Sequence, residues 1–74
     1  MTWEIIFEGH DWLGRSSKGA IFKVSKQPDL DFSWCYPAVL VAPDQERYII
    51  QNRARELGEA KRFCERVARA YGWE

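Results

Sequence analysis

The sequence has few of the residues that build metal sites or disulfide scaffolds. Its 74 residues include two cysteines, Cys35 and Cys64, and one histidine, His10. Neither cysteine has a second cysteine or a histidine close to it in the chain. This spacing excludes a paired-cysteine zinc site and a disulfide-rich secreted scaffold, so neither a metal nor another cofactor is expected. Both cysteines are predicted to be small buried thiols in a reducing compartment.

Net charge and long apolar runs are also absent. The chain carries 11 basic and 11 acidic side chains, which gives a formal net charge of zero. A domain that binds nucleic acid through phosphates usually has a strong basic excess, and this balance disfavours that class. No segment approaches the roughly 20 apolar residues of a membrane span, and the start "MTWEIIFEG" does not look like a signal peptide. A cytoplasmic protein with no membrane partner is expected.

The short chain limits the protein to one domain, residues 1–74. A chain of this size buries only about 60% of the surface of its unfolded form, so its single core is small. Four tryptophans, four phenylalanines and three tyrosines compensate, because each aromatic ring buries a large apolar area.

Alternating apolar and polar residues predict strands over residues 3–9, 20–26, 27–37 and 46–51. The apolar segment 38–42 predicts either a further strand or a continuation of the preceding strand beyond a bulge at Pro37. The clearest alternation places Leu30, Phe32, Trp34 and Tyr36 opposite Asp29, Asp31, Ser33 and Cys35. Residues 43–45, "PDQ", predict a turn that joins the last two strands into a hairpin. The segment "GHDWLGRSSKG" is rich in glycine and serine, and it is predicted to be a loop.

From about Arg55 the hydrophobic period changes to that of a helix. One stripe of a helical wheel is apolar, and it consists of Leu57, Ala60, Cys64, Val67, Ala68 and Tyr71. Gly72 is placed to end the helix in a left-handed cap. The expected fold is therefore α+β: an antiparallel sheet of about three to five strands with one C-terminal amphipathic helix packed on one face, in the order ββββα.

A row of arginines lies opposite the apolar stripe on the same wheel. It consists of Arg55, Arg62, Arg66 and Arg69, and all four are expected to point into solvent. Glu65 is placed to pair with Arg69, and such a pair contributes only a few tenths of a kcal/mol. Three interpretations remain open: a solvated helix face, a contact with an acidic protein surface, and a contact with nucleic-acid phosphates.

The segment "RELGEAKRFCE" resembles the start of the C-terminal helix in domains of the AP2 and integrase arm-binding kind. That resemblance implies a sheet that reads DNA with arginine and tryptophan on its exposed face. The comparable strands here carry acidic residues instead, namely Glu4, Glu8, Asp29 and Asp31. This departure counts against a role in DNA binding.

Two short segments raise the question of catalysis or anion binding. His10 lies near Glu8 and Asp11, which suits either a general base or metal ligand, or a polar loop tip. "GRSSKG", residues 14–19, has glycines at both ends, but a strand is expected after it, whereas phosphate-binding loops lead into a helix. No catalytic or metal-binding set of residues is expected.

The aromatic surplus favours a binding protein. Trp12 falls in the predicted loop next to Arg15, and tryptophan and arginine are enriched at binding hot spots. The expected function is a non-enzymatic protein that docks on a larger protein or nucleoprotein through Trp12, Arg15 and the arginine row. In size and aromatic content it resembles small accessory proteins of phages and mobile elements, such as anti-CRISPR inhibitors. The alternatives are a nucleic-acid-binding module that uses the same arginines, and a homodimer through a sheet edge.

Overall fold

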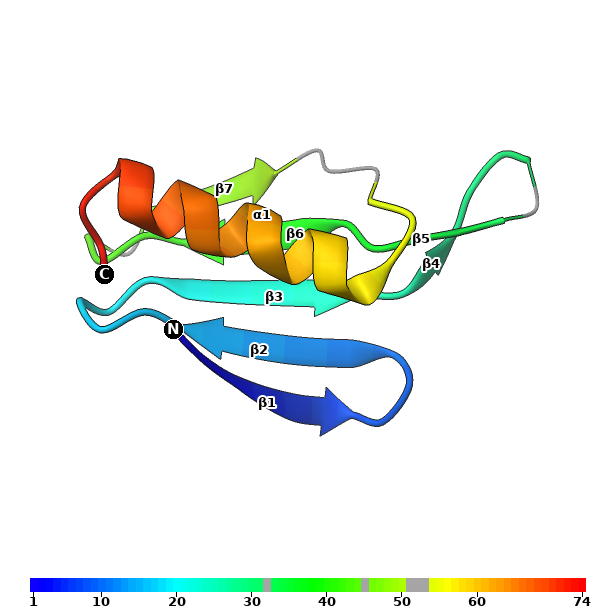
Figure 1. Cartoon of the computed structure of the whole chain (residues 1–74), viewed down its shortest axis with the longest axis horizontal. Helices are drawn as coiled ribbons and strands as arrows, with labels where there is room; N and C mark the ends of the chain where they lie inside the picture. The colour runs from blue at the N-terminus through cyan, green and yellow to red at the C-terminus, as the bar shows by residue number, and fades with distance from the viewer. Residues whose placement is uncertain (32, 45, 51–53) are drawn as a thin grey trace.

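A computed structural model describes residues 1–31, 33–44, 46–50 and 54–74 and shows an antiparallel sheet covered by one helix (Figure 1). The sheet contains β1 (Thr2–Phe7), β2 (Asp11–Arg15), β3 (Ile21–Ser25), β6 (Ala38–Val41) and β7 (Arg47–Ile50), in the order β1-β2-β3-β6-β7. Helix α1 (Leu57–Ala70) lies across one face. The predicted α+β fold is confirmed, with the extra hairpin β4 (Gln27–Pro28) and β5 (Trp34–Cys35) between β3 and β6. Phe32 and Gln51, which the sequence patterns place in strands, lie outside the described residues.

The core lies between the helix and one face of the sheet. Phe22 and Val24 of β3 are fully buried, and Leu40 of β6 pairs with Phe22 across the strands. From the helix, small side chains face them at every fourth position, namely Ala60, Cys64 and Ala68, all of them fully buried. Small residues at this spacing allow the helix to approach the sheet closely.

The predicted loop over residues 9–19 is wrong, because β2 lies in its middle. Trp12 and Gly14 point toward the helix side, and Leu13 and Arg15 point to the other face, which is a strand alternation. Gly14 is required because the ring of Trp3 lies directly on it: a Cβ at this position would come within 2.8 Å of Trp3. A glycine in a strand often marks such a close approach, and here it concealed the strand signal.

The long strand predicted over residues 27–37 is also wrong. Only β4 and β5 are extended, and they pair with each other as a two-stranded hairpin. Between them, Asp31 Oδ1 accepts hydrogen bonds from the N–H and hydroxyl of Ser33, and the N–H of Asp29 donates to the carbonyl of Ser33 at 2.8 Å. Asp and Ser side chains compete with strand pairing in this way, so the alternation ends in a turn.

The remaining elements agree with the sequence. β6 and β7 form the predicted hairpin. The helix ends at Ala70, and Gly72 follows it with a φ of +72°. The N–H groups of Gly72 and Trp73 donate to the carbonyls of Arg69 and Ala68. These two bonds form a Schellman cap. The N–H of Lys18 donates to the carbonyl of Trp73 at 2.9 Å, which ties the helix end to the β2–β3 turn. No helix in the part of the chain that the structure describes has the length and apolar character to cross a membrane.

Because of Cys64, the stability of the fold is expected to decrease at alkaline pH. Burial in the core, and secondarily the charge of Glu65, raise the pKa of its thiol from 9.0 to about 12. Above pH 9 the unfolded thiol loses its proton while the folded thiol keeps it, so the folded state binds more protons. We expect the free energy of unfolding to fall by up to about 1.4 kcal/mol per pH unit from this group between pH 9 and 12.

Urea denaturation at several pH values measures this slope. Cys64→Ala should lose this part of the decline, whereas Cys35→Ala should keep it, because Cys35 is a partly exposed free thiol outside the core cluster. Equal slopes in the two variants would contradict the assignment.

Candidate protein-docking surface

Trp12 is not available for docking, contrary to the prediction from the sequence. Its ring is only 8% exposed, and it packs in the core with its centroid 5.9 Å from that of Tyr36. The prediction failed because it placed Trp12 in a loop, whereas β2 turns this side chain toward the helix side. Trp12 is therefore a core residue.

Arg15 and Arg55 are exposed, but both are engaged within the protein. Arg15 points to the sheet face opposite the helix, and its Nε lies 3.3 Å from Glu4 of the adjacent strand. Arg55 precedes the first helical residue, Leu57, so it does not belong to the helical row. Its guanidinium forms ion pairs with Asp29 at 3.0 Å and with Asp31 at 3.7 Å.

The other three arginines remain on the outer face of α1. Arg62, Arg66 and Arg69 are exposed, as the wheel predicted. Among the described residues, none of the three has a carboxylate within 4.0 Å, and the expected Glu65–Arg69 pair is not formed. Three of the six predicted contact residues therefore form one uncompensated basic stripe, and the other three do not join it.

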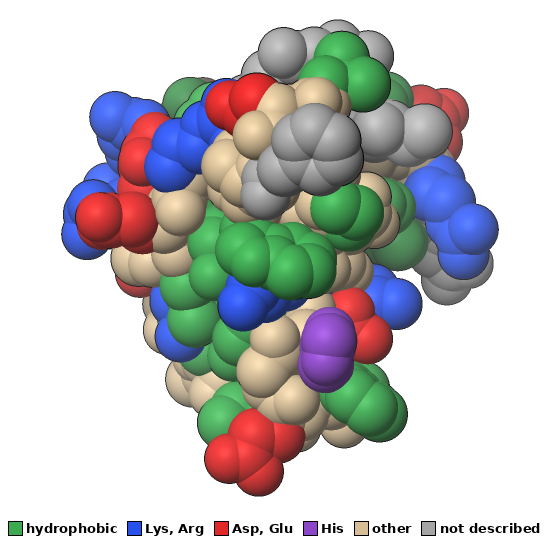
Figure 2. All heavy atoms as spheres, turned by 90° about the vertical axis from the view of Figure 1, so that its right-hand side faces the viewer, with side chains coloured by type: hydrophobic (Ala, Val, Ile, Leu, Met, Phe, Trp, Pro, Cys, Tyr) green, Lys and Arg blue, Asp and Glu red, His purple; other side chains and the backbone are tan. Residues whose placement is uncertain are grey.

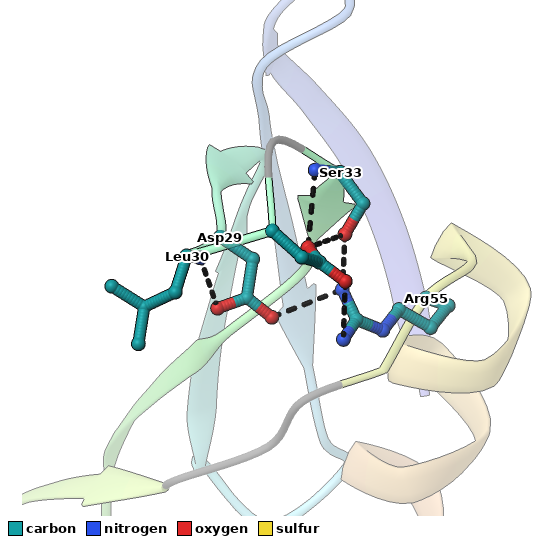
Figure 3. Close-up of polar contacts among 5 residues, drawn as sticks. Asp29, Leu30, Ser33 and Arg55 are labelled. Carbon is teal, nitrogen blue, oxygen red and sulfur yellow. Dashed lines mark hydrogen bonds and ion pairs between the residues drawn. The ribbon is translucent and has the colours of Figure 1, made fainter.

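Arg55 instead fixes the β4–β5 hairpin to the start of the helix (Figure 3). Besides its two ion pairs, it donates a hydrogen bond to the hydroxyl of Ser33. The hydroxyl and N–H of Ser33, followed by the charge of Arg55, lower the pKa of Asp31. The lowered pKa keeps the Asp31 carboxylate ionised at neutral pH, and the guanidinium of Arg55 lies between Asp29 and Asp31. Leu30 lies on the opposite side of this cluster and points away from it (Figure 3).

The molecule measures 36 × 22 × 19 Å. The β4–β5 hairpin stands at one end of its long axis (Figure 1). Large apolar side chains are exposed at this end: Leu30 is 91% exposed, Phe7 60% and Trp34 51%. Hydrophobic, basic, acidic and histidine side chains lie next to one another there (Figure 2). We call Phe7, His10, Lys26, Leu30 and Trp34 the hairpin-end surface.

Contacts between neighbouring side chains join most of this surface into one unit. The ring of Phe7 packs edge-on against His10, with centroids 5.1 Å apart. The N–H of Lys26 donates to the carbonyl of His10 at 2.7 Å, and its ammonium lies 4.8 Å from the ring centroid of Trp34. The cation holds one side of the indole and leaves half of the side chain open. The result is an ordered aromatic surface with a positive charge at its centre.

The sequence analysis missed this surface, apart from naming His10 as a polar loop tip or general base. The interpretation of residues 27–37 as one strand hid the hairpin that exposes Leu30 and Trp34. The available signal was Pro28 followed by Asp29, Asp31 and Ser33, because these residue types favour turns. In the described residues no three His, Cys, Asp or Glu side chains are grouped to hold a metal ion. Comparisons with protein families, with curated proteins and with solved structures find no match for this chain.

Proposed function

We propose that this chain is a non-enzymatic binding protein that docks on a larger protein by inserting the β4–β5 hairpin into a concave apolar site. The observation that supports this proposal is Leu30, which is 91% exposed on a hairpin that Arg55 holds in place. Burying a leucine side chain contributes about 1.5–3 kcal/mol, and a fixed hairpin loses little conformational entropy on binding. An inserted hairpin would occlude the site that it occupies. The phage-inhibitor class remains a prediction from size and aromatic content.

Capture from an extract of the native host tests the proposal. Tagged wild-type protein and Leu30→Asp are compared, and the retained proteins are identified by mass spectrometry. Leu30→Asp should lose the specific partner, because a carboxylate at the tip would be desolvated in an apolar site. The side chain is almost fully exposed, so the fold should be unaffected. The control Arg62→Glu with Arg66→Glu should retain the partner. Capture of the same protein by Leu30→Asp would contradict the proposal.

The basic stripe of Arg62, Arg66 and Arg69 supports a second candidate, a nucleic-acid contact. Its support is the lack of a carboxylate within 4.0 Å of these three side chains in the described part of the chain. Phosphate contacts weaken steeply with salt, with a log–log slope of about −0.9 for each phosphate neutralised on duplex DNA. Binding through the hairpin end would depend on salt much less. The same capture at low and high salt, with the Arg62→Glu and Arg66→Glu variant, distinguishes the two functions.

A further inference from the structure

The end of the molecule opposite the hairpin contains an aromatic groove. It lies between the β6–β7 hairpin and the C-terminal turn of α1, and has a volume of about 600 Å³. Leu40 and Val67 form its apolar floor, and Tyr48, Tyr71 and Trp73 line its sides. This volume falls within the range of about 300–1,000 Å³ that is common for small-ligand sites. The chain end and the turn between β6 and β7 are neighbours in Figure 1.

The aromatic rings of the groove present faces that attract cations. Tyr71 and Trp73 are stacked, with centroids 4.9 Å apart and an interplanar angle of 16°. Tyr71 nevertheless stays 69% exposed and Tyr48 45% exposed, so their rings are available to a ligand. The face of an aromatic ring carries negative potential and binds ammonium groups, especially quaternary ones.

Two carboxylates lie at or next to the same groove. Asp44 lies on its rim, and Glu46 accepts a hydrogen bond from the hydroxyl of Tyr48. This bond, followed by desolvation and the charges of Glu46 and Asp44, raises the pKa of Tyr48. Val67 of the last helical turn and Tyr71 at the C-cap also line the groove. Arg69, the basic residue of the last helical turn, does not line the groove.

We propose that the groove binds a small organic cation of the quaternary-ammonium class. The ammonium head would lie against Tyr48 and Tyr71 near Asp44, and an attached alkyl chain would lie on Leu40 and Val67. A neutral ligand of the same shape would gain the apolar contacts alone. This site is at the far end from the hairpin, so it is independent of the docking function proposed above.

Choline and its neutral isostere 3,3-dimethylbutan-1-ol test the charge requirement. Binding is followed by NMR through the indole N–H signal of Trp73, which Trp73→Phe identifies. Because choline is small, we expect it to bind the groove with a Kd of about 1 mM or weaker. Choline should bind about 5-fold more tightly than the neutral isostere. Hexyltrimethylammonium should bind more tightly than choline, because its chain covers the apolar floor.

Two variants at the groove and one elsewhere complete the experiment. Asp44→Asn and Tyr71→Leu should each weaken choline binding, and both residues are exposed enough for the fold to persist. Trp34→Ala, at the hairpin end, should bind choline as the wild type does. Equal affinities for choline and the neutral isostere would overturn the proposal, and so would the absence of any shift of the Trp73 signal.

Discussion

Replacing Phe22 with alanine is expected to lower the free energy of unfolding by about 3–5 kcal/mol, which is the usual cost of removing a buried phenylalanine ring. Phe22 is fully buried at the centre of β3, between the helix and the sheet. A domain of 74 residues has a total stability of roughly 4–11 kcal/mol. The loss is thus a large share of the total, and part of the Phe22→Ala population should be unfolded at 37 °C. Urea or thermal denaturation measures the change.

Val39→Ala is the matched control for this prediction. Val39 sits in β6 beside Leu40, the cross-strand partner of Phe22, but it points to the sheet face opposite the helix and is 37% exposed. Its truncation should cost less than about 1 kcal/mol, because the side chain is already partly in water. If the two substitutions had similar effects, the core would not lie between the helix and β3.

The helix could be predicted from sequence because its signal is long and periodic. Ala60, Cys64 and Ala68 lie on the predicted apolar stripe, and all three are fully buried. The stripe repeats over several turns, so one exposed member such as Tyr71 does not obscure it. The left-handed cap at Gly72 was predicted from residue type, because glycine is the residue that adopts a positive φ without strain.

The errors at β2 and at the β4–β5 hairpin have a shared physical cause. In both segments specific side-chain contacts, which hydrophobic periodicity does not contain, accompany the observed conformation. Gly14 is part of a strand because Trp3 packs over it, and composition alone shows only a glycine among polar residues. Asp31 and Ser33 close the hairpin turn through local hydrogen bonds, and Arg55, far along the chain, joins Asp29 and Asp31 to the start of the helix. Periodicity within a short window contains none of these contacts.

The candidate site was harder to predict than the fold. Arg55 was assigned to the helical row because the wheel was extended back through residue 55, whereas the helix begins at Leu57. Two residues before the helix, the side chain no longer follows the helical period and reaches the hairpin instead. Its contacts join the turn that carries Leu30 to the start of the helix. The sequence predicted that some aromatic residues are exposed, but it did not identify Phe7 and Trp34 among them.

Leu30 and Trp34 differ from Arg55 in what they would contribute to docking. The first two are exposed apolar side chains that a partner would bury. Arg55 is half exposed and acts by holding the hairpin, and an exposed ion pair of this kind contributes about 1 kcal/mol or less. Asp29, its partner, is only 12% exposed and would lose its compensating charge without the arginine. Removing the contacts of Leu30 and Trp34 is therefore expected to weaken binding more than removing Arg55, which only holds the hairpin in place.

Replacing both Leu30 and Trp34 with alanine is expected to weaken binding to the purified partner by about 10³-fold, since hot-spot side chains contribute about 2 kcal/mol each. Isothermal titration calorimetry measures this change. Arg55→Ala should weaken binding by only about 5-fold, with the hairpin exchanging its amide hydrogens faster while the core remains protected. Arg15→Ala, on the other sheet face, should leave the affinity unchanged. If Arg55→Ala had the larger effect, the guanidinium itself would contact the partner, and the hairpin tip would not be the anchor.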